Sequence, residues 1–144
     1  MDLMHATCVE VDGVGVLLRG PSGSGKSDLA LRLMNEGARL VSDDQVAIRV
    51  AGGHLIAAAP DALDGMIEVR GMGVISVPSV AQVRIELMVD LVPAEDLSRL
   101  PEPTHLDIGG IALPLFFMAP FEGSATAKLR LAVRAVRHDI VHNG

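Results

Sequence analysis

A glycine-rich segment followed at once by lysine and serine constrains this chain more than any other feature of its sequence. The segment reads Gly20-Pro21-Ser22-Gly23-Ser24-Gly25-Lys26-Ser27 and matches the pattern GxxxxGK[ST]. Small residues let successive backbone N–H groups turn toward phosphate oxygens, and a helix that begins there adds partial positive charge. The apolar run Val14 to Leu18 precedes the segment, and apolar residues at helical spacing follow it. The sequence therefore predicts a strand, a phosphate-binding loop and a helix, in that order.

The polar residues that end the loop have separate expected roles. Lys26 reaches the outer phosphates of a nucleotide as a point charge. The hydroxyl of Ser27 is suited to ligate Mg²⁺, which bridges the phosphates. A plain strand–turn–helix connection is the alternative, but it does not explain why lysine follows three glycines in six positions. We therefore expect nucleotide or polyphosphate binding by the whole loop, which comprises Gly20, Pro21, Ser22, Gly23, Ser24, Gly25, Lys26 and Ser27.

Pairs of turn-forming residues predict hairpins on both sides of this loop. Asp12-Gly13, Gly52-Gly53 and Gly109-Gly110 each separate two apolar runs, as the type I′ turns of hairpins do. The strand that enters the phosphate loop is then the second arm of a hairpin. Val83 to Leu91 alternates apolar and polar residues, which predicts a half-buried strand. We therefore predict an α/β phosphate-loop domain with a mixed, largely antiparallel sheet, rather than a doubly wound parallel one.

Three helices are predicted around this sheet. The first follows the phosphate loop and ends at Gly37, because glycine suits a helix C-terminus. The second is a short helix from Pro93 to Leu100. The third begins at Ser124, which is a suitable capping residue. Its expected apolar face consists of Ala125, Leu129, Ala132, Val133, Val136 and Ile140.

Composition and charge limit the classes of function. A chain of 144 residues suits one domain, here 1–144. Its net charge of −6 and its aromatic content of 2% argue against a nucleic-acid partner. The single cysteine, Cys8, excludes an internal disulfide and is expected to be a small buried hydrophobe. No apolar run approaches the roughly 18 residues of a membrane span, and no secretion signal is visible, so we expect a cytoplasmic protein without a membrane partner.

Two adjacent carboxylates, Asp43 and Asp44, follow the apolar pair Leu40-Val41. They are suited to serve as a metal-side acid and a catalytic base. A solvated turn is the alternative, because aspartate favours turns. The loop lysine 17 residues before Asp43 makes the catalytic interpretation the better one. Which of the two aspartates is the base stays open.

Other candidate site residues are ambiguous by themselves. Glu68 and Arg70 alternate in an extended run, which places both on one face of a strand. A carboxylate and a guanidinium there suit metal and phosphate, but a surface ion pair explains the pattern equally well. His5, on a strand near the N-terminus, is by itself typical of surface decoration.

Taken together, these segments resemble HPr kinase/phosphorylase, specifically its C-terminal catalytic domain. The resemblance rests on His5 ahead of Gly13-Val14-Gly15-Val16, on the phosphate loop, and on two later segments. These are Gly37-Ala38-Arg39-Leu40-Val41-Ser42-Asp43-Asp44-Gln45-Val46 and Ile67-Glu68-Val69-Arg70-Gly71-Met72-Gly73-Val74-Ile75-Ser76-Val77. It is clear over about residues 5 to 80.

The resemblance implies a fold related to phosphoenolpyruvate carboxykinase and an ATP- and Mg²⁺-dependent kinase. Its substrate would be a seryl residue of the carrier protein HPr, and many members of that family reverse the reaction by phosphorolysis. The resemblance also implies a homo-oligomer, a hexamer. By resemblance, Lys26 binds the phosphates, and Ser27 and Glu68 hold Mg²⁺. One of Asp43 and Asp44, with Asp44 preferred, takes the proton; His5 lies near the site, and Arg70 belongs to the signature segment.

The sequence departs from the family pattern in two ways. The family's usual N-terminal domain has no counterpart in it, so we expect a short form that comprises only the C-terminal catalytic domain. The family carries a functional arginine in a late Gly-Arg-Asn stretch, and here Ile111 to Phe121 runs into Glu122-Gly123-Ser124 without a counterpart. Phosphorolysis is therefore expected to be the weaker direction. Two other classes remain open: a nucleotide sensor that switches a partner without phosphotransfer, and a small-molecule kinase on the same fold.

Overall fold

The hairpin that leads into the phosphate loop lies within the main sheet, one strand from its edge. In the computed structural model, which describes residues 2–61 and 64–137, β2 (Thr7–Val11) pairs antiparallel with β3 (Val14–Arg19). The turn residues Asp12 and Gly13 have φ angles of 50° and 82°, as a type I′ turn requires. β3 then enters the loop, and α1 (Lys26–Asn35) leaves it. The predicted hairpin, strand, loop and helix are confirmed.

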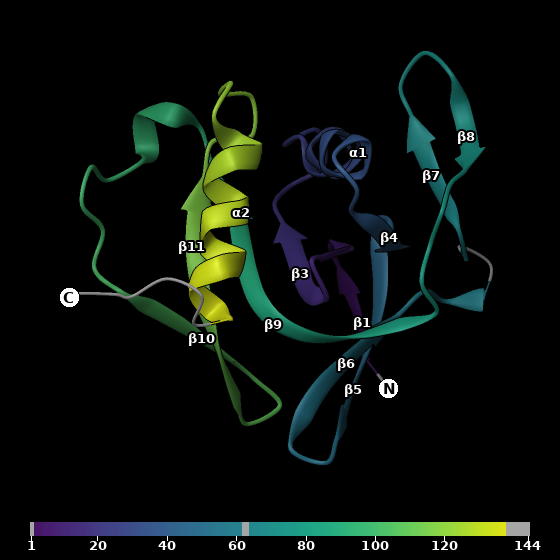
Figure 1. Cartoon of the computed structure of the whole chain (residues 1–144), viewed down its shortest axis with the longest axis horizontal. Coiled ribbons are helices and arrows are strands. Elements are labelled where there is room, and N and C mark those ends of the chain that lie inside the picture. The colour runs from purple at the N-terminus through teal and green to yellow at the C-terminus, as the bar shows by residue number, and fades with distance from the viewer. Residues whose placement is uncertain (1, 62–63, 138–144) are drawn as a thin grey trace.

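A nine-stranded sheet surrounds this hairpin in the order β1-β5-β6-β9-β3-β2-β4, with β11 beside β9 and β10 beside β11 (Figure 1). The remaining strands are β1 (Asp2–His5), β4 (Arg39–Ser42), β5 (Gln45–Ala51), β6 (His54–Ala58), β9 (Gln82–Leu91), β10 (Thr104–Ile108) and β11 (Ile111–Met118). Among the described strands, β3–β9 and β9–β11 pair in parallel and the other pairings are antiparallel. β7 (Met66–Val69) and β8 (Gly73–Ser76) form a separate hairpin. The predicted mixed, largely antiparallel sheet is confirmed.

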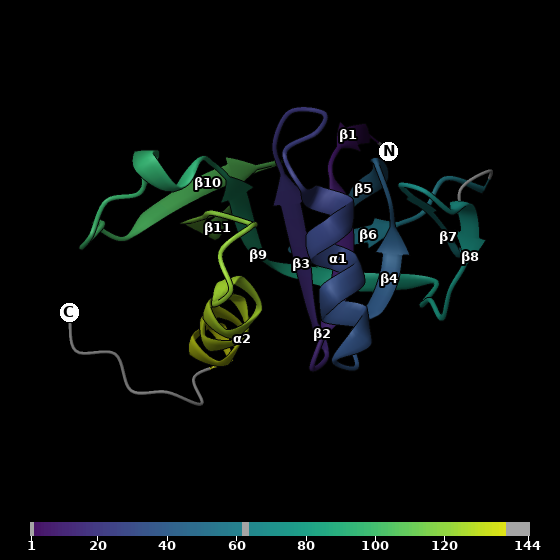
Figure 2. The same cartoon turned by 90° about the horizontal axis from the view of Figure 1, so that it is seen from above.

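The central strands are buried on both faces. Val16 and Leu18 join a core cluster with residues of α1 and α2 (Ala125–Val136), whereas Leu17 and Cys8 join a second cluster on the other face. Figure 2 shows the two helices beside each other, and α1 packs on β2 and β4 while α2 packs on β9 and β11. Complete burial raises the pKa of the Cys8 thiol far above its usual range, so this residue is the buried hydrophobe that was predicted.

The helix ends confirm one prediction and correct another. α1 closes with a Schellman motif, in which the N–H groups of Gly37 and Ala38 donate to the carbonyls of Met34 and Leu33. Ser124 precedes α2, but its side chain makes no capping hydrogen bond. Of the apolar face predicted for α2, Ile140 lies outside the described residues. No helix among the described residues is long and apolar enough to cross a membrane.

The helix predicted from Pro93 to Leu100 is wrong. Only the 3₁₀ turn η2 (Ala94–Asp96) forms, and Leu97 is already extended. None of the residues in this turn is buried. Short helices depend on burying an apolar face, and the residue before a proline disfavours helical angles, so the chain toward Pro101 stays irregular.

Gly15 permits the close approach of β3 to β9. A Cβ atom placed there would lie 2.3 Å from the carbonyl oxygen of Arg84 and 2.7 Å from Cγ1 of Val83. We therefore expect Gly15→Ala to lower the free energy of unfolding by about 1–3 kcal/mol, because the strands would have to move apart. Gly123→Ala is the control, since a Cβ atom there meets nothing within 4 Å. Urea unfolding of both variants checks this, and equal stabilities would contradict it.

Candidate active site

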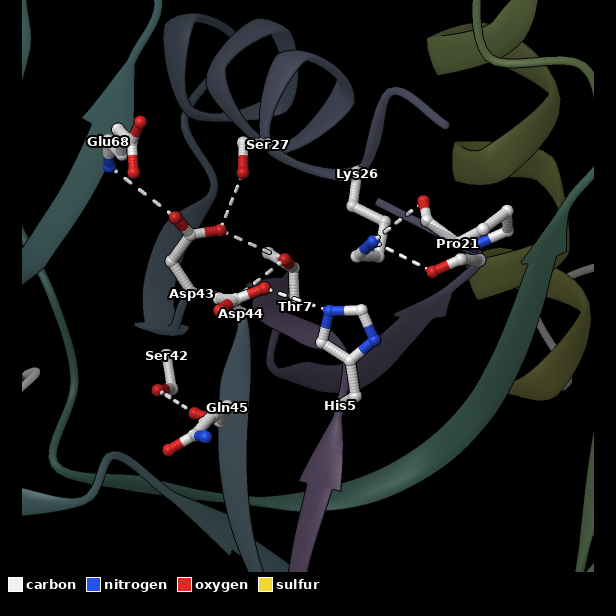
Figure 3. Close-up of polar contacts among 11 residues, drawn as sticks. His5, Thr7, Pro21, Lys26, Ser27, Ser42, Asp43, Asp44, Gln45 and Glu68 are labelled. Atoms are coloured by element: carbon white, nitrogen blue, oxygen red, sulfur yellow. Dashed lines mark hydrogen bonds and ion pairs between the residues drawn. The ribbon is translucent and has the colours of Figure 1, made fainter. Parts of the chain in front are cut away.

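The side chain of Lys26 folds back over the phosphate loop. Its Nζ donates to the carbonyl oxygens of Gly20, at 2.8 Å, and Pro21, at 3.1 Å (Figure 3). The residue is only 6% exposed, and it forms no ion pair with any residue that the structure describes. A buried cation without a counter-charge is costly, so an anion bound at this loop would be strongly favoured.

The glycines of the loop are required by its tight packing. A Cβ atom on Gly20 would lie 2.5 Å from Oγ of Ser24, and Gly25 has a φ angle of 102°. The buried Oγ of Ser24 has no hydrogen-bond partner among the described residues. A compact loop with an unpartnered hydroxyl, a buried ammonium group and the N-terminus of α1 fits a polyphosphate.

Asp43 joins three segments of the chain through its carboxylate. Its Oδ1 accepts hydrogen bonds from Oγ1 of Thr7, at 2.9 Å, and from Oγ of Ser27, at 2.7 Å. Its Oδ2 accepts a longer bond of 3.4 Å from the backbone N–H of Glu68. Asp43 is only 7% exposed. These donors fix the carboxylate beside the loop serine, which suits a metal-side role better than proton transfer to an incoming substrate.

Asp44 points away from this cluster and toward solvent. Its Oδ1 accepts a hydrogen bond of 2.9 Å from Nε2 of His5, and the two side chains are 67% and 49% exposed, respectively (Figure 3). The pairing of β1 with β5 places His5 opposite Gln45, the residue after Asp44. Asp44 has a φ angle of 68°, which aspartate tolerates better than most residues. The adjacent aspartates therefore differ sharply in environment, one buried beside α1 and one accessible beside a histidine.

Glu68 lies on a strand, whereas Arg70 lies in the turn that follows it, so the structure differs from the prediction that both occupy one face of a strand. Glu68 lies on β7 beside Asp43 and has an exposed side chain. Arg70 follows the end of β7 and opens the turn to β8, because Gly71 and Gly73 have positive φ angles. The prediction of one shared strand face is therefore wrong, and the alternative Glu68–Arg70 ion pair does not form among the described residues. Among the described residues, no hydrogen bond or ion pair joins Arg70 to the cluster around Asp43.

Sequence analysis missed Thr7, which lies fully buried between the two aspartates. Besides its bond to Asp43, its Oγ1 accepts a hydrogen bond of 3.4 Å from the backbone N–H of Asp44. Nothing in the sequence distinguishes this threonine from any other strand threonine, because its partners lie 36 and 37 residues away.

The donor set near Ser27 fits Mg²⁺. It offers the Ser27 hydroxyl and the carboxylate of Asp43, which are both hard oxygen ligands, and Glu68 approaches Asp43 through its backbone N–H. Within residues 2–61 and 64–137, no three acidic, histidine or cysteine side chains form a ready-made metal cage. Mg²⁺ in proteins usually takes one or two carboxylates and completes its shell with water and substrate phosphates.

Comparison with known proteins decides the family. The sequence profile of the family described as HPr Serine kinase C-terminal domain matches residues 1–118. The chain belongs to this family. The Coxiella burnetii HPr(Ser) kinase/phosphatase structure matches it with a TM-score of 0.86 and 28% identity, over 96% of this chain and 98% of that one. The match confirms the α/β fold and the resemblance drawn from the sequence.

Curated relatives of this HPr Serine kinase C-terminal domain match about half of the chain. The HPr kinase/phosphorylase of Clostridium tetani (strain Massachusetts / E88) is 50% identical over 76 residues, which is 53% of this chain and 25% of the relative. That of Clostridium novyi (strain NT) is 49% identical over 76 residues, with the same coverage. The matched region thus spans about a quarter of the length of these relatives.

The two aspartates should respond differently to the same substitution. In Asp43→Asn, an amide N–H₂ group replaces an oxygen that accepts hydrogen bonds, so we expect unfolding free energy to fall by about 1–3 kcal/mol. In Asp44→Asn, the exposed side chain and the tolerance of asparagine for positive φ should keep the change within about 0.5 kcal/mol. Urea unfolding of both variants is the measurement. Equal losses would show that Asp43 is no more constrained than Asp44.

Proposed function

We propose that this chain is an ATP- and Mg²⁺-dependent kinase that phosphorylates a seryl residue of the carrier protein HPr. The observation that carries the proposal is the continuous polar path from a phosphate loop to an accessible carboxylate. Lys26 and Ser27 lie on the loop, Asp43 binds Ser27, and Asp44 emerges beside His5. The names of the Clostridium relatives and of the Coxiella structure support HPr as the substrate.

The loop residues would bind and orient the triphosphate. Backbone N–H groups at the start of α1 and the ammonium group of Lys26 face the phosphate oxygens, with Lys26 exchanging its carbonyl partners for phosphate. Ser27, Asp43 and Glu68 would hold Mg²⁺. When bound, that ion would neutralise charge that develops on the transferred phosphoryl group.

Asp44 is the proposed general base. Its carboxylate takes the proton of the substrate serine as the seryl oxygen bonds to the γ-phosphorus and the bond from that phosphorus to the oxygen of ADP breaks. His5 holds Asp44 in place by the hydrogen bond to Oδ1. The accessibility of Asp44 supports this role over Asp43, because a protein-borne serine must reach the base from solvent. Arg70 is retained as a proposed site residue only by its place in the family signature.

The organisation of the protein is proposed on the resemblance alone. We take residues 1–144 as one catalytic domain that acts in the cytoplasm as a homo-oligomer, with the family hexamer as the expected state. Light scattering measures the assembly. A monomer that still phosphorylates HPr would remove the oligomer from the proposal and leave the activity intact.

The decisive experiment incubates the protein with ATP, Mg²⁺ and the HPr of the same genome. Mass spectrometry should find one added phosphoryl group on a seryl residue of HPr. ATP hydrolysis without HPr modification would favour the nucleotide switch, and phosphorylated metabolites in a cell extract would favour the small-molecule kinase. Either result would replace the proposed activity.

Substitutions at Lys26 and Asp44 should separate binding from chemistry. Lys26→Ala should abolish phosphotransfer and weaken ATP binding, because it removes the cation of the loop. Asp44→Asn should lower kcat by about 10²- to 10⁴-fold while changing the Kd for ATP less than threefold, because a base acts on the acceptor hydroxyl. Calorimetry and steady-state kinetics measure both. A collapse of ATP affinity in Asp44→Asn would place that carboxylate on the metal side.

The forward reaction should exceed phosphorolysis. The Gly-Arg-Asn stretch is absent from the sequence, and two basic residues of α2 are already paired with carboxylates. Lys128 binds Glu122 at 3.0 Å, and Arg130 lies near Asp12 and Glu36, at the end of β3 opposite the phosphate loop. Phosphoserine-HPr with millimolar phosphate should therefore release pyrophosphate slowly. Release as fast as the kinase reaction would refute this expectation.

A further inference from the structure

An aromatic ring lies against the phosphate loop with its outer surface open. Phe121 is 71% exposed, although the chain has only three phenylalanines and no tryptophan or tyrosine. A Cβ atom placed on Gly25 would lie 2.9 Å from Cζ of this ring and 3.1 Å from Cγ of Pro120. The ring therefore borders the loop directly before Lys26, and burial of its own apolar surface does not explain its position.

The backbone around Phe121 is held by contacts of other residues. Arg32 of α1 donates from Nη2 to the carbonyl oxygen of Pro120, and its Nε binds Asp28 at 3.1 Å. The N–H of Glu122 donates to the carbonyl of Ala119 at 3.3 Å. This segment, 119–122, is thus fixed to the helix that starts at the phosphate loop. The ring is presented by an anchored turn, which is the arrangement expected of a preformed binding surface.

The sheet places this ring on the side of the loop opposite the aspartates. β3, β9 and β11 run parallel, and Arg19, Asp90 and Phe117 lie in register near their ends. Their C-terminal ends therefore share one edge of the sheet, where the N–H of Val92 also donates to the carbonyl of Met118. Asp43 and Asp44 follow β4, on the other side of β3 beyond β2. Ligands of such sheets bind outside the C-terminal ends of the parallel strands.

A nucleotide bound to this loop has a terminal phosphate at one end and a nucleoside at the other, and each end requires a different binding surface. Its terminal phosphate must face the proposed base, Asp44, so its nucleoside must leave toward the other side, where Phe121 lies. A flat apolar ring there suits the face of a nucleobase, because base–aromatic stacking does not depend on hydrogen-bonding groups.

We propose that Phe121 is the nucleobase platform of this site, on which the base of a bound nucleotide stacks. This inference rests on the proposed function, because it assumes that a nucleotide binds the phosphate loop. It assigns the phosphate affinity to the loop and a separate, base-dependent part of the affinity to the turn between β11 and α2. Phe121 is in this sense a positioning residue for the nucleotide.

The test compares a ligand with a base and one without. Calorimetry with Mg²⁺ should show that Phe121→Ala weakens ATP and GTP by about tenfold and inorganic tripolyphosphate by less than twofold. Phe121→Leu keeps apolar bulk without a flat ring and should recover only part of the loss. Phe117→Ala, on β11, is the control and should leave both affinities unchanged. Equal weakening of ATP and tripolyphosphate, or no weakening of ATP, would overturn the platform.

Phe121→Trp gives a second readout, because it would introduce the only tryptophan of the chain. ATP and GTP should quench its fluorescence and tripolyphosphate should not. Quenching by all three, or by none while calorimetry still shows ATP binding, would contradict stacking. An altered KM for HPr with unchanged ATP affinity would assign Phe121 to the protein substrate. Failure of the unsubstituted protein to bind either ATP or tripolyphosphate would instead refute the proposed function.

Discussion

The buried carboxylate of Asp43 is the interaction on which the candidate site depends. It accepts hydrogen bonds from β2 through Thr7, from α1 through Ser27 and from β7 through Glu68. Three segments that are distant in the sequence are thereby held at one point beside the phosphate loop. Because a buried carboxylate is costly unless its hydrogen bonds are satisfied, these donors are constraints on the fold as well as on the chemistry.

Beside the Asp43 carboxylate, the two sides of β3 carry different groups of residues. One side of β3 carries the aspartates and His5, and the other carries the turn that holds Phe121. Lys26 lies between them with its charge directed at backbone carbonyls. The bidentate pair of Arg19 and Asp90, at 2.7 and 2.8 Å, ties β3 to β9 directly before the loop, and its hydrogen bonds raise the pKa of Arg19. This ion pair thus fixes the end of β3 from which the phosphate loop starts.

Part of this fold and of the candidate site could be predicted from the sequence, because it depends on residues that are close together in the chain. The glycine pattern of the loop, the Asp12-Gly13 turn and the Gly37 helix end each depend on residues a few positions apart. The different surroundings of Asp43 and Asp44 were not predictable, because the partners of these residues come from β1 and β2 across the sheet. Short-range patterns also misplaced Arg70, since alternation does not reveal where a strand ends.

His5 of the candidate site lies on β1, a short strand at the edge of the sheet. β1 has four residues, pairs only with β5 among the described strands and fully buries none of its side chains, although Met4 packs partly against the core. Such edge elements open locally at far lower free energy than the core. Fraying of β1 would separate His5 from Asp44 while the phosphate loop, held by β2, β3 and α1, stayed intact. The phosphate loop and the His5–Asp44 pair, to which we assign separate roles in the proposed kinase, thus lie in parts of the fold that differ in local stability.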